Sequence, residues 1–219
     1  MLKAVILDMD GVMVDSECCW EKVEYDLLKS LVPNWDKTKH RSVIGMSPRD
    51  IYQYLKINHN LKIQKDEFIR TYDKIAYTIY KNEVKVYPKL IDFIKKIKQN
   101  KLKIGICSSS PRGWIDLVVN RFDLFDYIDK IVSSEDIPGK GKPNPEIYLK
   151  IIEELKVRKK EVLVIEDSKK GIQAAKSAGL YCIGFKNGFN NDQDLNKADS
   201  IISSFSNILD INKLTKNFH

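Results

Sequence analysis

The chain opens on LKAVIL (residues 2–7), which runs directly into DMDGV (residues 8–12). The apolar run predicts a buried strand, and the glycine lets the backbone turn sharply where that strand ends. Two carboxylates beside a buried strand, Asp8 and Asp10, are costly, because each loses water and each repels the other. The pair could simply cap a strand–loop turn. The alternative that we favour is a metal-dependent site in which one aspartate reacts.

The residues that follow this stretch show helical patterns and no strand pattern as far as about residue 81. Ser16 is placed to cap a helix over 17–31, which has one apolar face, and Ser47-Pro48 opens a second helix. The apolar face of the first helix consists of Trp20, Val23, Leu27, Leu28 and Leu31. A third stripe consists of Ile69, Tyr72, Ala76 and Ile79.

From residue 88 onward helices and strands alternate. The expected helices are 88–98, 113–119, 145–155 and 169–178, and the expected strands are 103–107, 131–132, 162–165, 181–183 and 200–202. This alternation predicts an α/β protein: a Rossmann-like parallel sheet with helices on both faces, plus an inserted α-helical cap domain. We expect residues 1–15 and 86–219 to form the core, and residues 16–85 the cap.

The composition is that of a globular protein with a basic surface. The chain has 219 residues, 43% of them hydrophobic, and a net charge of +7. The lysines are scattered over helix faces, which favours a solvated surface over nucleic-acid binding. The four cysteines show no metal-binding spacing, and Cys107 and Cys182 lie in apolar runs, so we expect free thiols in a reducing compartment. No apolar run approaches the ~20 residues of a membrane span, and we expect a cytoplasmic monomer.

Polar residues follow three of the predicted strands, at the edge of a parallel sheet where ligands bind. Asp8 and Asp10 follow the first strand, Ser108-Ser109-Ser110 follow the second, and Glu166-Asp167 follow a third. Carboxylates suit a hard cation such as Mg²⁺, and hydroxyl and amide groups at a helix start suit phosphate. Ser110 is also placed to cap the helix after it.

These motifs, together with Lys142-Pro143-x-Pro145 and Glu166-Asp167-Ser168-x-x-Gly171-Ile172, resemble those of the haloacid dehalogenase superfamily. The Asp-x-Asp form resembles its phosphatase and phosphomutase members. The resemblance covers nearly the whole chain, including the helical cap after the first motif.

The resemblance implies a role for each matching residue. Asp8 would be the nucleophile and Asp10 the general acid/base. Phosphate would be bound by Ser108 with help from Ser109, and by Lys142. The implied ligands of Mg²⁺ are the Asp8 carboxylate, the Asp10 main-chain oxygen and Asp167, with Glu166 either a direct ligand or acting through another residue.

The cap resembles that of the sugar-phosphate branch, which includes β-phosphoglucomutase and hexose- or polyol-phosphate phosphatases. Where the mutase has a histidine, this chain has Trp20, whose ring could stack on a sugar or anchor the cap's own core. Where the mutase has an arginine in its cap loop, this chain has Pro48, with Arg49 one position later. Arg49 could bind substrate or lie on the surface.

The sequence thus predicts a Mg²⁺-dependent phosphatase acting on a small sugar or polyol phosphate. Its expected partner is a small phosphorylated metabolite, without nucleic acid or membrane. A β-phosphoglucomutase-like phosphomutase is the alternative enzyme, and a non-catalytic phosphate-ligand binding protein is the alternative from another class.

Overall fold

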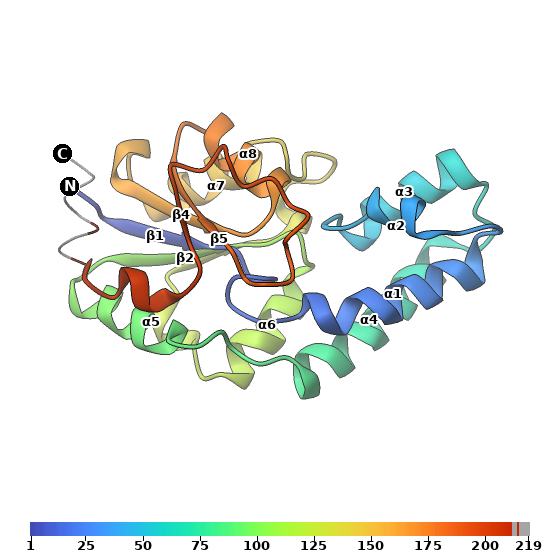
Figure 1. Cartoon of the computed structure of the whole chain (residues 1–219), viewed down its shortest axis with the longest axis horizontal. Helices are drawn as coiled ribbons and strands as arrows, with labels where there is room; N and C mark the ends of the chain where they lie inside the picture. The colour runs from blue at the N-terminus through green and yellow to red at the C-terminus, as the bar shows by residue number, and fades with distance from the viewer. Residues whose placement is uncertain (212–213, 215–219) are drawn as a thin grey trace.

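The computed structural model describes residues 1–211 and 214, and its centre is a parallel sheet of six strands (Figure 1). The strand order is β3-β2-β1-β4-β5-β6, with each neighbouring pair parallel. The strands are β1 (Ala4–Leu7), β2 (Lys103–Cys107), β3 (Lys130–Val132), β4 (Val162–Glu166), β5 (Tyr181–Phe185) and β6 (Ser200–Ile202). The predicted α/β fold is confirmed.

Helices cover both faces of this sheet, because side chains alternate along a strand. In β1, Val5 and Leu7 pack on one face, with α5 (Leu90–Gln99) and α6 (Arg112–Arg121). Ala4 and Ile6 pack on the other face, with α7 (Glu146–Leu155) and α8 (Lys169–Ser177). Short 3₁₀ turns are η2 (Phe125–Tyr127), η3 (Ser134–Asp136), η4 (Lys159–Glu161) and η5 (Phe205–Ile208).

Between β1 and α5 the chain forms a helical insertion, which runs from α1 to η1 and extends to one side of the sheet (Figure 1). It contains α1 (Glu17–Leu31), α2 (Lys37–Arg41), α3 (Pro48–His59), α4 (Lys65–Thr78) and one π-helical segment, η1 (Ile79–Glu83). The two linkers to the insertion hydrogen-bond to each other, since the Asp15 amide donates to the Lys85 carbonyl at 3.0 Å.

Some local predictions for the helical insertion are confirmed and others are wrong. Ser47 caps α3 as predicted, accepting a bond from the amide of Asp50, but the Ser16 side chain does not cap α1. Val23, expected on the apolar face of α1, is 39% exposed, whereas Leu28 of the same helix is fully buried. The first helix therefore presents a narrower apolar stripe than its sequence pattern indicates.

All four cysteines are free, and Cys107 and Cys182 are buried, as predicted. Among the described residues, no helix is long and apolar enough to cross a bilayer.

Candidate active site

The strand register brings the predicted carboxylates together. Leu7 of β1 pairs with Ile106 of β2 on one side and with Ile165 of β4 on the other. The residues that follow these three are Asp8, Cys107 and Glu166. They therefore lie side by side, with Asp8 in the middle. The site thus forms at the carboxyl edge of the sheet's central strands.

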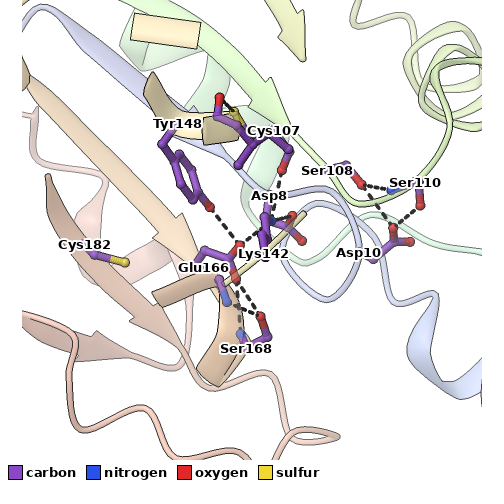
Figure 2. Close-up of polar contacts among 12 residues, drawn as sticks. Asp8, Asp10, Cys107, Ser108, Ser110, Lys142, Tyr148, Glu166, Ser168 and Cys182 are labelled. Carbon is purple, nitrogen blue, oxygen red and sulfur yellow. Dashed lines mark hydrogen bonds and ion pairs between the residues drawn. The ribbon is translucent and has the colours of Figure 1, made fainter. Parts of the chain in front are cut away.

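Lys142 joins this cluster from the loop before α7, as Figure 2 shows. Its ammonium lies 2.5 Å from Asp8 Oδ1, donates to Glu166 Oε1, and lies 3.3 Å from the carbonyl oxygen of Cys107. Burial by itself lowers the pKa of Lys142, but the two carboxylates raise it overall. The lysine thus stays charged and offsets the repulsion between Asp8 and Glu166.

Glu166 is fully buried, and protein groups supply four donors to its carboxylate. Oε1 accepts from Lys142 and from the Tyr148 hydroxyl at 2.8 Å, and Oε2 accepts from the Ser168 amide at 3.2 Å and hydroxyl at 3.1 Å (Figure 2). A carboxylate has about four lone-pair positions that can accept hydrogen bonds, so these four donors occupy all of them. Glycine at 171 makes room, because a Cβ there would lie 2.0 Å from the Glu166 carboxyl.

Asp167 is held beside Asp8 by residues that follow β5. Its Oδ2 accepts from the Asn187 side chain at 2.9 Å, and its main-chain oxygen accepts from Asn190 at 2.7 Å. Gly11, with φ +74°, must lack a side chain, since a Cβ would lie 2.0 Å from Asp167 Oδ2. One oxygen each of Asp8, Glu166 and Asp167 lies within 4.8 Å of the others, and all three residues are buried.

Burial raises the pKa of both Asp8 and Asp167. For Asp8 the Glu166 and Asp10 charges add to this effect, and the Lys142 charge opposes it. For Asp167 the Glu17 and Glu166 charges add to it. Carboxylates in this situation favour a cation among them.

Asp10 directs its carboxylate to a separate set of hydroxyl groups. Oδ1 accepts from Ser16 and Tyr80, each at 2.6 Å, and Oδ2 accepts from Ser110 at 2.7 Å and from Ser108 at 3.4 Å. Figure 2 shows Asp10 and the two serines beside the cluster of Asp8, Lys142 and Glu166. The two aspartates of the first motif therefore have different partners.

The three serines after β2 differ in their surroundings. Ser108 is buried, and its hydroxyl also accepts from the Ser110 amide at 3.0 Å. Ser110, expected as a helix cap, makes no cap bond to α6, because its hydroxyl donates to Asp10 instead. Ser109 lines a cleft of about 230 Å³.

That cleft lies between the helical insertion and the α/β part. The insertion contributes Gly45, Ser47 and Asp50, and the α/β part contributes Lys142 and Lys170 along with Ser109. The cleft therefore reaches the cationic residue of the acidic cluster, and a small molecule bound there would touch both parts of the chain.

Trp20 is engaged in an aromatic cluster. Its ring stacks on Tyr72 of α4 at 5.9 Å and on Trp114 of α6 at 5.3 Å between centroids, and its indole N–H donates to the Tyr80 hydroxyl at 3.0 Å. Of the two roles considered from the sequence, this geometry favours the packing anchor, which here joins the insertion to α6.

Arg49 forms an ion pair with Glu135 of the α/β part at 3.1 Å. The Arg49 side chain is 56% exposed, and Arg49 is not among the residues that line the cleft. An exposed pair of this kind contributes little to stability, about 0–1 kcal/mol. In this structure Arg49 contacts the opposite part of the chain at the surface.

Sequence reasoning missed four residues that contact the predicted site residues. Tyr80 binds Asp10, Tyr148 binds Glu166, and Asn187 and Asn190 bind Asp167. None belongs to a recognisable motif. Tyr148 gave one signal, a phenol within a helix directly after the predicted lysine loop.

The chain is therefore an α/β protein with a helical insertion after β1 and a buried acidic cluster at the ends of its central strands. The sequence pattern of the haloacid dehalogenase-like hydrolases matches residues 5–185. The chain belongs to this family, and the predicted resemblance is confirmed.

Several known proteins are similar to this chain over most of its length. A phosphorylated carbohydrates phosphatase of Thermotoga maritima is 29% identical over 201 residues, which are 91% of this chain and 93% of the relative. Hexitol phosphatase B of Escherichia coli is 28% identical, with 82% of each chain covered. The crystal structure of a β-phosphoglucomutase from Clostridium difficile superposes with a TM-score of 0.79 at 25% identity, covering 100% of this chain and 97% of that one.

Proposed function

We propose that this chain is a Mg²⁺-dependent phosphatase that hydrolyses a small sugar or polyol phosphate through an aspartyl-phosphate on Asp8. The observation that carries the proposal is the Asp8 carboxylate, buried at the edge of the sheet with Lys142 at 2.5 Å and Asp167 beside it. The similarity to a phosphorylated carbohydrates phosphatase and to a hexitol phosphatase supports the substrate class.

The donor set fits a hard cation. The Asp8 and Asp167 carboxylates and the Asp10 main-chain oxygen would hold Mg²⁺, which prefers oxygen ligands. The four donors to Glu166 leave it better suited to orient Lys142 than to bind the ion directly. When bound, the ion would neutralise charge on the phosphoryl oxygens.

In the first step an Asp8 oxygen attacks phosphorus and the ester P–O bond breaks. The leaving alcohol oxygen takes a proton from the Asp10 carboxyl group. Lys142 and the hydroxyls of Ser108 and Ser109 would bind the phosphoryl oxygens, and the Lys142 charge would favour the ionised form of Asp8 that attacks.

In the second step Asp10 takes a proton from water, and the water oxygen attacks phosphorus. The bond between Asp8 and phosphorus breaks and inorganic phosphate leaves. We propose that the helical insertion, residues 16–85, acts as a cap that excludes bulk water from the cleft during both steps.

The test is phosphate release from a panel of hexose, pentose and hexitol phosphates, with and without Mg²⁺. Asp8→Asn should abolish release, and Asp10→Asn should lower it at least about 10²-fold, because both proposed proton transfers use the Asp10 carboxyl group. Asp116→Asn, on the exposed face of α6, is the matched control and should keep wild-type rates. Full activity of Asp8→Asn, or no Mg²⁺-dependent release by the wild type, would refute the proposal; the latter result would favour a binding protein.

The similarity to a β-phosphoglucomutase structure favours a phosphomutase as the second candidate. A mutase must hold a second phosphate away from the metal, and here Arg49 is paired with Glu135. With β-glucose 1-phosphate, Mg²⁺ and a bisphosphate primer, a phosphatase releases phosphate. Clean conversion to glucose 6-phosphate would establish the mutase.

A further inference from the structure

A lysine of helix α8, Lys170, lines the cleft opposite the helical insertion. Its ammonium donates one long bond, 3.4 Å, to the main-chain oxygen of Ile44. Within residues 1–211 and 214, no carboxylate forms an ion pair with it. An ammonium has three N–H donors, so two remain free for a ligand.

Lys170 is not an ordinary surface lysine surrounded by water. The residue is half-buried, and this burial lowers its pKa, with the charge of Asp50 acting in the opposite direction. Lys142, which also lines the cleft, is already engaged by Asp8 and Glu166. Lys170 is thus a desolvated cation with unused donors at the edge of the site.

Asp50 supplies an acceptor on the other wall. It lies in the first turn of α3, where its Oδ2 accepts from the Ser47 hydroxyl at 2.7 Å. The same oxygen reaches toward Gly141, since a Cβ there would be 3.4 Å away. A positive donor and a negative acceptor therefore face one cleft from the two parts of the chain.

We propose that Lys170 and Asp50 recognise hydroxyl groups on the non-transferred part of the substrate and so select neutral, polyhydroxylated phosphate esters. This inference rests on the proposed phosphatase function. A hydroxyl group can accept from the ammonium and donate to the carboxylate, so it satisfies both. A second anion would lie against Asp50, and an apolar group would leave both charges unpaired.

The first experiment compares two substrates in each variant: p-nitrophenyl phosphate, whose leaving group has no alcohol hydroxyls, and the best substrate of the sugar and polyol phosphate panel. The measured quantity is the ratio of their kcat/KM values. Lys170→Met should lower the ratio of sugar to nitrophenyl ester by about tenfold or more, as expected for loss of a charged hydrogen bond. Lys169→Met, at the exposed neighbouring position of α8, should leave the ratio unchanged.

The second experiment tests the charge preference. Sorbitol 6-phosphate and 6-phosphogluconate have the same carbon chain and differ at one end, where the first has a hydroxyl and the second a carboxylate. Asp50→Asn should raise kcat/KM for 6-phosphogluconate relative to sorbitol 6-phosphate by about tenfold, because Lys170 then faces the carboxylate without opposition. An unchanged ratio would overturn the inference.

The outcomes separate the two proposals. If the wild type releases no phosphate from any of these esters with Mg²⁺, the proposed function fails and the inference fails with it. If the wild type is active but Lys170→Met lowers kcat/KM equally for both substrates, the role of Lys170 is limited to its contact with Ile44. In that case the inference alone is overturned. Hydrolysis of p-nitrophenyl phosphate without hydrolysis of any panel member would refute the sugar or polyol substrate class of the proposed function, and the inference would fail with it.

Discussion

The hydroxyl group of Tyr80 donates to Asp10 at 2.6 Å across 70 residues of sequence. Tyr80 lies in the π-helical segment that ends the helical insertion, and it is almost fully buried. The guanidinium of Arg121 in α6 donates to the carbonyl oxygens of Tyr80 and Asn82 at 3.0 and 3.1 Å. The proposed general acid is thereby tied to the insertion, and the insertion is tied to the α/β part.

Tyr80→Phe removes this hydroxyl, which is also the acceptor of the Trp20 indole N–H at 3.0 Å. We expect kcat to fall about tenfold with a small change in KM, because Asp10 loses a charged hydrogen bond that fixes its carboxyl group. Steady-state kinetics on the best sugar phosphate measures kcat and KM separately. Tyr77→Phe is the matched control, since Tyr77 is 48% exposed and contacts Lys81 instead. A wild-type kcat in Tyr80→Phe would show that the bond has no role in turnover.

Lys142→Met leaves Asp8 and Glu166 adjacent, buried and without their shared cation. We expect the free energy of unfolding at pH 7 to fall by about 3–5 kcal/mol, the usual cost of breaking a buried ion pair. Activity should fall at least about 10²-fold, because the phosphoryl group loses a positive donor. Urea unfolding and phosphate release measure the two effects.

Lys140→Met provides the control for this variant. Lys140 lies in the same loop, but it is 65% exposed and its contact with Glu146 is 3.9 Å long. Its loss should change stability by less than about 1 kcal/mol. Equal destabilisation by the two substitutions would contradict the assignment of Lys142 as the cation that neutralises the cluster.

The residues that sequence reasoning could place are those whose position follows from local pattern. Asp8, Ser108 and Glu166 each come directly after an apolar run, and parallel strands end at a common edge, so their convergence is predictable. The order of the strands does not follow from local pattern, because β1 pairs with β2 and β4, which lie far from it along the chain. Helix bounds agreed within about two residues, as is usual where caps are weak.

The residues that escaped prediction act over long sequence distances. Tyr80 and Asn187 reach Asp10 and Asp167 only through the arrangement of the helical insertion and of the loop after β5. Ser16 and Ser110 illustrate a second limit. A hydroxyl beside a helix start can cap it or bind a nearby carboxylate, and only the fold shows that both serines bind Asp10.

Gly171→Ala tests the close approach of Glu166 to helix α8. The added Cβ would lie 2.0 Å from the Glu166 carboxyl, so the carboxylate that orients Lys142 must shift. We expect a loss of about 1–3 kcal/mol in unfolding free energy and a lower kcat/KM. Gly113→Ala in α6 is the control, because nothing lies within 4 Å of its Cβ. There, alanine should be neutral or stabilise by about 0.5–1 kcal/mol. Equal stability of the two variants would refute the steric argument.

Glu24→Gln tests a carboxyl group within the helical insertion whose side chain is only 14% exposed. Glu24 accepts from the Tyr72 hydroxyl at 3.1 Å, and burial raises its pKa to about 7 from 4.5. Between these values the folded protein binds more protons than the unfolded chain, so the free energy of unfolding falls as pH rises and then levels off above about pH 7.

The glutamine cannot ionise, so Glu24→Gln should remove this contribution to the pH dependence. At pH 8 it should be more stable than the wild type by about 3 kcal/mol, and below about pH 4.5 the two should be equal. Urea unfolding from about pH 4 to 8 measures the difference, with Glu21→Gln on the exposed side of α1 as the control. A Glu24→Gln variant less stable than the wild type at pH 8 would mean that the ionised carboxylate is favoured in the folded insertion, and that burial does not dominate its pKa.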